Sequence, residues 1–318
     1  MSNTLAVPEN KHVAALYDRA KEYARQSRAE NTLLTYAKQW RHFEGFCRTI
    51  GADPLPCLPV TVCAYLTHLS KEKKASTLKT KLAAIAFRHR TAGLPDPTKD
   101  EAVKLTLDGI RRTRGTATER KAAVSRDLLE QMLSAQPDDL RGTRNRAMLL
   151  VNYACDLRRS ELVALTIADV KFLKDRMVVT IRRSKTDQAG QGYEINVPRL
   201  NSTLCPVRAL KTWLDVAHIK TGPLFRKVDH WEHVGQQALT DQVVARIVKQ
   251  SANAIGIDAS QFAGHSLRRG LITQAALNEE QTADIRKVSR HKTEIMIDAY
   301  RADTARAQLR VIRRALED

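Results

Sequence analysis

The sequence predicts a mostly α-helical protein of two domains, the second of which contains a small antiparallel sheet. Apolar residues recur at spacings of three and four over most of the chain, which is the period of an amphipathic helix. One pair of segments, 177–181 and 193–197, instead has strand character on either side of a polar, glycine-containing turn. A charged segment without apolar periodicity, at 113–122, separates a domain at 11–112 from one at 123–318.

The first domain is expected to be a bundle of four or five helices, preceded by a disordered lead at residues 1–10. The longest helical pattern runs from Val13 to about Gly51, with Thr32 as a candidate N-cap. The apolar face of this pattern consists of Leu33, Tyr36, Trp40, Phe43 and Cys47. After a proline-rich break, three shorter helices are expected at 61–70, 76–93 and 101–112.

The second domain is expected to begin with an amphipathic helix capped by Ser125, because a serine hydroxyl can accept from a free backbone N–H in the first turn. A further apolar segment follows from Arg144 to Ala154. The two strands come next, with Lys185 in the turn between them, and the pattern is helical again from Pro206.

The charge of the chain favours a polyanionic partner. Lys and Arg number 53 against 35 Asp and Glu, which gives a net charge of +18 and a pI of about 9.9. Residues 1–115 hold 20 basic and 11 acidic residues, so this part contributes +9 and the remainder another +9. A basic tail would have concentrated the charge, whereas this distribution predicts that both domains touch nucleic acid. The alternative is a highly soluble surface.

Five cysteines are scattered without a C-x-x-C pair, which favours neither a disulfide framework nor a zinc site. This usage fits a reducing, cytoplasmic compartment. The N-terminal residues lack the apolar run of a signal peptide, and no stretch reaches the length needed to span a bilayer, so no membrane partner is expected.

Basic residues of the first domain and the linker are candidates for contacts with DNA phosphates, since helix ends and long cationic side chains commonly make them. The alternative for each is a solvated helix face. The candidates are Lys79, Lys81, Arg88, Arg90, Arg111, Arg112 and Arg114.

Five separated pieces of the second domain carry residues suited to phosphoryl chemistry. His265 and Arg268 are three positions apart and would share one face at a helix start, where backbone N–H groups attract an anion. Each piece alone is weak, because a lysine in a turn is usually solvated and most H-x-x-R pairs are surface or core residues. In chain order the full set is Arg158 with Glu161, Lys185, His265 with Arg268, His291, and Tyr300.

These pieces resemble the tyrosine site-specific recombinases of the lambda-integrase family, and most closely the Cre-like phage branch. The resemblance rests on Leu157-Arg158-Arg159-Ser160-Glu161-Leu162, Ser184-Lys185-Thr186, Gly264-His265-Ser266-Leu267-Arg268 and Ala299-Tyr300. It implies an N-terminal core-binding bundle and a C-terminal catalytic domain that together clamp DNA. It also implies strand exchange through a 3′-phosphotyrosine without metal, ATP or another cofactor.

The resemblance implies a role for each residue, and the chemistry agrees. Two guanidiniums, Arg158 and Arg268, suit the anionic oxygens of the transition state, with Glu161 orienting the first. Tyr300 is the only tyrosine after Tyr193 and would be the nucleophile. His265 would take its proton and Lys185 would protonate the leaving 5′ oxygen, while His291 would hydrogen-bond the phosphate.

The chain departs from the family pattern at two places. Asp156 stands where many members have glycine, and this change is expected to be harmless. Ser289-Arg290 stands before His291 where Leu-Gly is common. Three arginines beside the proposed residues are expected to hold DNA backbone or solvent, namely Arg159, Arg269 and Arg290. The pair His230 and His233 is expected to lie in a loop without a metal.

The resemblance implies a homotetramer on duplex DNA with inverted-repeat target sites, in a bacterial or phage-encoded, nucleoid-associated protein. Residues 304–318 form an amphipathic stripe that would dock on a neighbouring subunit, or alternatively on its own domain. Rival functions are a type IB topoisomerase or telomere resolvase, which share the chemistry, and a DNA-binding regulator without catalysis. A metal nuclease is disfavoured because no tight group of carboxylates occurs.

Overall fold

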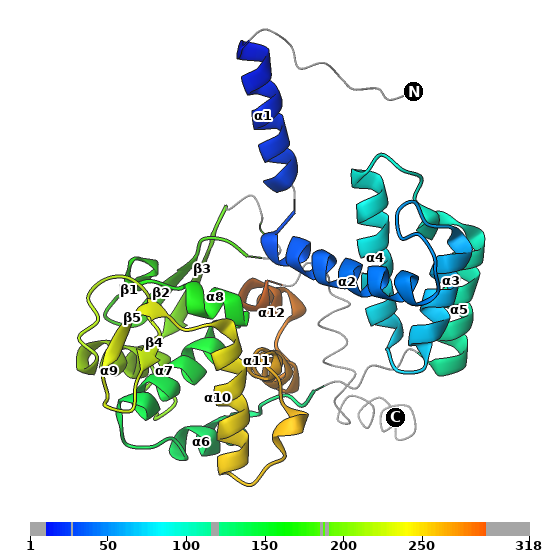
Figure 1. Cartoon of the computed structure of the whole chain (residues 1–318). Helices are drawn as coiled ribbons and strands as arrows, with labels where there is room; N and C mark the ends of the chain where they lie inside the picture. The colour runs from blue at the N-terminus through cyan, green and yellow to red at the C-terminus, as the bar shows by residue number, and fades with distance from the viewer. Residues whose placement is uncertain (1–10, 27, 116–120, 185–186, 188–190, 291–318) are drawn as a thin grey trace. The chain divides into compact units, whose positions relative to one another are not determined.

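The computed structural model describes residues 11–26, 28–115, 121–184, 187 and 191–290, and it divides the chain into two compact units, 1–119 and 120–318 (Figure 1). The division falls inside the predicted linker. The fold is mostly helical with small antiparallel sheets, as the sequence predicts.

The first unit is helical, and residues 40–110 supply its small hydrophobic core. They are α1 (Lys11–Gln26), α2 (Glu30–Thr49), α3 (Pro59–Ser70), α4 (Ala75–Thr91), a short 3-10 turn (Pro97–Lys99) and α5 (Glu101–Arg114). Within the unit α2 packs against α4, and α3 packs against α5. The fully buried side chains include Phe43, Tyr65, Leu66 and Leu78.

Two boundaries in the first unit differ from the prediction. The pattern from Val13 to Gly51 forms two helices, because the chain leaves the helical path between Gln26 and Glu30. Thr32 therefore lies inside α2, and Ala29 occupies the N-cap without a side-chain bond. At the other end α5 continues to Arg114, so Thr113 and Arg114 are helical rather than part of the linker.

The second unit consists of helices and two small sheets. Its helices are α6 (Arg126–Ser134), α7 (Leu140–Ala154), α8 (Arg159–Ala164), α9 (Pro206–Val216), α10 (Asp241–Ala254), α11 (Ser266–Leu277) and α12 (Thr282–Ser289). Its strands are β1 (Val170–Phe172), β2 (Arg176–Ile181), β3 (Tyr193–Pro198), β4 (Arg226–Val228) and β5 (Val234–Ala238). Short 3-10 turns occupy Ile167–Asp169 and Ala259–Gln261.

The predicted hairpin is confirmed as β2 and β3, which pair antiparallel with Val179 opposite Ile195. Along β2 the side chains of Met177, Val179 and Ile181 face the core, as the period of a half-buried strand requires. Strand β1 completes this sheet in the order β1-β2-β3, and β4 pairs with β5 in a second sheet. The sequence pattern does not predict β1, β4 or β5.

Local sequence explains where the main helices of this unit begin. Ser125 Oγ accepts from the backbone N–H of Leu128 at 3.2 Å, so the predicted cap of α6 is confirmed. Asp139 Oδ1 accepts from Gly142 N at 2.6 Å and caps α7 in the same way. In the core beside α7, Trp213 is fully buried and donates to the carbonyl of Leu224 at 2.8 Å.

The start of α11 is fixed by close backbone packing. Val124 N donates to the carbonyl of Ser266 at 3.0 Å. A β-carbon at Gly270 would lie 2.0 Å from the carbonyl oxygen of Val124, so only glycine permits this approach. The first turn of α11, which carries Arg268, is therefore held against the entry segment of the unit.

Within the residues placed by the structure, none of the helices is both long and apolar enough to cross a membrane. The same residues contain no group of three His, Cys, Asp or Glu side chains that could hold a metal ion. His230 and His233 lie in the turn between β4 and β5, as predicted, where His233 contacts Asp229.

Candidate active site

Arg158 occupies the N-cap position of α8 and is held by Glu161 three residues later. Glu161 Oε2 accepts from the backbone N–H of Arg158 at 3.0 Å, and its Oε1 accepts from Arg158 Nη1 at 2.6 Å. The Glu161 side chain is 3 % exposed, whereas that of Arg158 is 19 % exposed. One carboxylate thus caps the helix and fixes an arginine that still reaches solvent.

His265 and Arg268 meet at the start of α11. His265 stands at the N-cap position and is exposed, and Arg268 lies in the first turn with its side chain 7 % exposed. Arg268 Nη1 lies 3.0 Å from Asp156 Oδ2 and also donates to the carbonyl of Asp156. Its Nη2 donates to the carbonyl of Ser289 at 2.5 Å.

Arg290, directly after α12, joins these two groups. Its Nη2 donates to the carbonyl of Asp156 at 2.8 Å and to Glu161 Oε2 at 3.0 Å. Three arginines and two acidic residues are thus linked in a chain of contacts, in which Arg290 reaches Asp156 through its backbone carbonyl. We call this chain the buried charge network; its members are Arg158, Glu161, Arg290, Asp156 and Arg268.

Burial and charge act in opposite directions on the carboxylates of the buried charge network. Burial raises the pKa of Asp156 well above its ordinary value, although Arg268 and Arg290 act against this. For Glu161 burial is outweighed by the charge of Arg290 and by hydrogen bonds from Arg158, so its pKa is lowered. Burial also lowers the pKa of Arg268. Each charge of the network has an opposite charge beside it, but neither oxygen of the Asp156 carboxylate accepts a hydrogen bond from the described residues.

The structure thus brings Arg158, Glu161 and Arg268 together, with His265 at the start of the helix that carries Arg268. The other three predicted site residues, Lys185, His291 and Tyr300, lie outside the described residues. Next to Lys185, Ser184 N donates to the carbonyl of Asp187 at 3.3 Å. At the base of the hairpin Tyr193 donates from its hydroxyl to the carbonyl of Lys287 in α12.

Two residues lie in surroundings that the sequence did not predict. Asp156, expected to be a harmless replacement, is completely buried and contacts Arg268. Arg290, expected to hold DNA backbone or solvent, has a side chain only 8 % exposed and contacts Glu161. The available signal was that both departures from the family pattern occur at glycine positions and have opposite charges.

The remaining two neighbouring arginines contact their own unit. Arg159 lies 3.6 Å from Asp241 of α10, and its side chain packs where a β-carbon at Gly264 would otherwise lie. Arg269 donates to the carbonyl of Lys121.

Most of the basic residues predicted to contact DNA are exposed in the first unit. Lys79, Arg88, Arg90, Arg112 and Arg114 are exposed, and Arg111 is half-buried. Several are engaged locally: Arg90 pairs with Asp96 at 3.0 Å and Arg111 with Asp108 at 3.0 Å, while Arg88 lies over the ring of Trp40.

Lys81 contradicts its prediction. It is 3 % exposed, and its ammonium donates to Gln39 Oε1 at 2.9 Å and to the hydroxyl of Tyr65 at 3.1 Å. Burial lowers its pKa. Its helical position faces α2 and α3 rather than solvent, so Lys81 supports the core of the first unit instead of contacting DNA.

A surface hollow of about 420 Å³ gathers cations at the start of α4 and the end of α5. We call it the basic hollow. Five basic side chains and one acidic side chain line it, namely Lys73, Lys74, Lys79, Arg111, Arg114 and Glu72. The excess of positive charge suits an anionic ligand.

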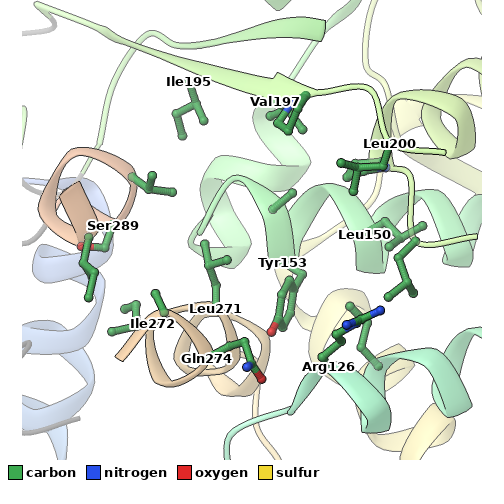
Figure 2. Close-up of a pocket in the computed structure, with 18 of the residues that line it drawn as sticks. Arg126, Leu150, Tyr153, Ile195, Val197, Leu200, Leu271, Ile272, Gln274 and Ser289 are labelled. Atoms are coloured by element: carbon green, nitrogen blue, oxygen red, sulfur yellow. The ribbon is translucent and has the colours of Figure 1, made fainter. Parts of the chain in front are cut away.

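The second unit also contains an apolar cavity of about 520 Å³ (Figure 2). Its walls come from α6, α7, β3, α11 and α12, and the labelled side chains include Leu150, Ile195, Val197, Leu271 and Ile272. We call it the apolar cavity. Its lining suits hydrophobic side chains rather than a charged ligand.

Comparison with known proteins gives a consistent result. Residues 123–306 match the phage integrase family. An integrase/recombinase XerD homologue of Selenomonas ruminantium is 36 % identical over 287 residues, which cover 89 % of this chain and 84 % of the relative. The Cre recombinase of Escherichia phage P1 is 27 % identical over 206 residues, which cover 63 % of this chain and 59 % of Cre. The resemblance to Cre is confirmed, although the identity to the Selenomonas protein is higher.

Solved structures share the fold. The Tn1549 transposon integrase in complex with transposon right end DNA matches with a TM-score of 0.61 and 17 % identity, covering 94 % of this chain and 98 % of that one. The XerH recombinase bound to a palindromic difH substrate matches with a TM-score of 0.61 and 15 % identity, covering 81 % and 72 %. The Selenomonas protein and Cre are both named as recombinases. Since the family match spans more than half of the chain and the match to the Selenomonas protein covers most of it, the chain belongs to the phage integrase family.

Proposed function

We propose that the protein is a site-specific DNA recombinase that cuts and rejoins duplex DNA through a 3′-phosphotyrosine formed by Tyr300. The observation that carries this proposal is the convergence of Arg158 and Arg268 in one buried charge network. The two guanidiniums come from distant parts of the chain and are linked through Glu161, Arg290 and Asp156. A pair of guanidiniums suits an anionic phosphodiester because each can donate two parallel hydrogen bonds.

The two arginines differ in exposure and therefore in role. Arg158 keeps part of its side chain in solvent and would bind a non-bridging phosphate oxygen directly. Arg268 is more deeply buried. Its positive charge would stabilise the negative charge that develops on the same phosphate in the transition state. Because both guanidiniums are fixed before DNA binds, little rearrangement is needed to reach the transition state.

The nucleophile and the proton carriers complete the proposed reaction. A tyrosine has an ordinary pKa of about 10, so the hydroxyl of Tyr300 needs a proton acceptor at neutral pH. His265 serves as that acceptor, since it is exposed at the start of α11 and an imidazole titrates near neutral pH. Lys185 protonates the leaving 5′ oxygen and His291 donates a hydrogen bond to the phosphate. The phosphotyrosine conserves the bond energy, so a DNA 5′-hydroxyl reverses the step without ATP.

The basic hollow of the first unit is the proposed contact for the DNA backbone. Lys79, Arg111 and Arg114, all predicted from the sequence, line it together with Lys73 and Lys74. Phosphate contacts of this kind fix the register of a protein on duplex DNA without reading its sequence. The chain would act on the DNA of the bacterial nucleoid or of a phage.

The working assembly is proposed to be a homotetramer on two target sites with inverted repeats. The solved XerH structure contains a palindromic substrate and that of lambda integrase is a dimer on a core site, which supports symmetric binding. The apolar cavity is proposed to receive residues 304–318 of a neighbouring copy. Its apolar lining complements the sequence stripe of Ala305, Leu309, Ile312 and Leu316.

A covalent-adduct assay tests the reaction. The probe is a duplex that the wild-type protein selects from a randomised pool, nicked in its spacer so that a cleaved strand is lost and the adduct persists. In the presence of EDTA we expect an adduct with the wild type and with the matched control Tyr193→Phe, and none with Tyr300→Phe. An adduct that Tyr300→Phe still forms overturns the assignment. Exchange between two sites on one plasmid then distinguishes a recombinase from a type IB topoisomerase.

A further inference from the structure

Asp156 and Arg290 share an uncommon backbone conformation. Their φ angles are +48° and +55°, in the left-handed region that favours glycine. A β-carbon is crowded by the following carbonyl oxygen in this conformation, and although Asp tolerates the region, Arg is not enriched in it. The tyrosine recombinases that this sequence resembles commonly have glycine at both positions. The side chains must therefore contribute something that offsets the strained backbone.

Both side chains enter the buried charge network. Asp156 is completely buried, and the Arg290 side chain is 8 % exposed. Burying a single charge is strongly unfavourable unless an opposite charge and hydrogen bonds accompany it. Here Asp156 pairs with Arg268, and Arg290 pairs with Glu161. Asp156 therefore contacts one of the two proposed phosphate-binding arginines, and Arg290 contacts the carboxylate that holds the other.

The two residues leave the charge of the site unchanged. With all five groups ionised, Arg158, Glu161 and Arg268 sum to +1, and Asp156 and Arg290 add −1 and +1. Arg268 and Arg290 favour the ionised form of Asp156 against the effect of its burial. The attraction for a phosphate is therefore retained while two contacts are gained. One holds the guanidinium of Arg268, and the other holds the carboxylate that orients Arg158.

We propose that Asp156 and Arg290 form a coupled pair of positioning residues that holds both phosphate-binding arginines in place. This inference rests on the proposed function, because it assigns Arg158 and Arg268 to the phosphate. It adds that the two departures from glycine work only together.

The coupling predicts different results for single and double replacements. Asp156→Gly leaves Arg290 and Arg268 as excess buried positive charge, whereas Arg290→Gly leaves the Asp156 carboxylate without its second cation. The double replacement D156G/R290G restores the balance of +1 and relieves the left-handed backbone at both positions. Arg268 keeps its bonds to the carbonyls of residue 156 and Ser289, which do not depend on the side chains replaced.

The test is the rate of adduct formation on the nicked, selected duplex at saturating protein, together with the affinity for that duplex. We expect each single glycine variant to lose roughly 10-fold or more in rate, and the double variant to recover to within about 3-fold of the wild type, because contacting charges couple. Affinity should change much less than the rate. Asp156→Asn removes only the charge and tolerates the left-handed backbone, so it should also be slow even if a glycine variant folds poorly. His218→Gly, at another left-handed position in this unit with an exposed side chain, is the matched control and should react at the wild-type rate.

The results separate the inference from the proposed function. If the wild type forms the adduct and the rate losses of the two single variants multiply in the double variant, the positioning pair is wrong and the proposed function stands. A wild-type rate for Asp156→Asn would also contradict the pair. If the wild type forms no adduct, the proposed function fails and the inference fails with it.

Discussion

Arg290 donates from Nη2 to Glu161 Oε2 at 3.0 Å across 129 positions of sequence. This bond fixes the residue that follows α12 to the start of α8, where Glu161 also holds Arg158. One carboxylate therefore serves as the common anchor for both segments.

Glu161→Gln should lower the free energy of unfolding of the second unit by on the order of 3 kcal/mol at neutral pH. The replacement keeps a polar group of the same shape but removes the charge that Arg158 and Arg290 share, and a buried pair that loses one partner is strongly destabilised. Urea denaturation of the wild type and the variant measures the difference.

The loss of stability caused by Glu161→Gln should depend on pH. The pKa of Glu161 in the folded protein lies below its ordinary value of 4.5, because Arg290 and the bonds from Arg158 outweigh its burial. Its stabilising contribution is therefore complete above 4.5 and is lost as the pH falls through the lower folded value. The difference between the wild type and Glu161→Gln should shrink in that acid range. A difference that stays constant down to the acid transition would contradict the charged network.

Gly270→Ala should destabilise the second unit by about 1–3 kcal/mol, as overpacking of a close contact does. The added β-carbon would lie 2.0 Å from the carbonyl oxygen of Val124 and 2.7 Å from Tyr153 Cε2. The backbone at Val124 would have to shift to relieve this overlap. Gly109→Ala in α5 is the control, because nothing lies within 4 Å and alanine is the better helix former. Thermal unfolding should show a loss for the first and none for the second.

Lys79 and Lys81 should behave oppositely when replaced by alanine. Lys79→Ala removes an exposed cation of the basic hollow, so it should weaken DNA binding and reduce the slope of log affinity against log salt by about 1. Lys81→Ala removes the buried bonds to Gln39 and Tyr65 and should instead cost about 1–3 kcal/mol of stability in the first unit. A lower salt slope for Lys81→Ala at unchanged stability would restore it as a DNA contact.

Replacing Leu309 and Ile312 by serine should prevent assembly on two-site DNA while leaving adduct formation by a single bound copy intact. These side chains belong to the stripe proposed to enter the apolar cavity, whereas the control Ala307→Ser would lie on the opposite face of the expected helix. Sedimentation of protein–DNA complexes measures the assembly. If the double serine variant assembles normally, the segment does not dock on a neighbour.

The sequence was informative where a pattern is local. The caps of α6, the β2–β3 hairpin and the helix start before Arg268 follow from spacing and turn chemistry over a few residues. The contact between Arg158 and Glu161 could also be predicted from the sequence, because a spacing of three positions at a helix start places the two side chains together.

Long-range packing was not accessible in the same way. In the sequence Lys81 cannot be distinguished from the other basic residues around it. Its ammonium lies beside Gln39 only because α4 packs against α2. The strands β1, β4 and β5 are short and show no clear alternation of apolar and polar residues. They form strands because they pair with neighbouring strands, which the local sequence does not reveal. Asp156 and Arg290 are separated by 134 positions, and no local rule brings them together.

The most direct measurement is the identification of the residue that becomes attached to DNA. The wild-type adduct, formed on the nicked duplex in EDTA, is digested and the DNA-linked peptide is sequenced by mass spectrometry. The proposed chemistry predicts a single linkage from the hydroxyl of Tyr300 to a 3′-phosphate. A linkage to a different residue, or to a 5′-phosphate, would contradict it.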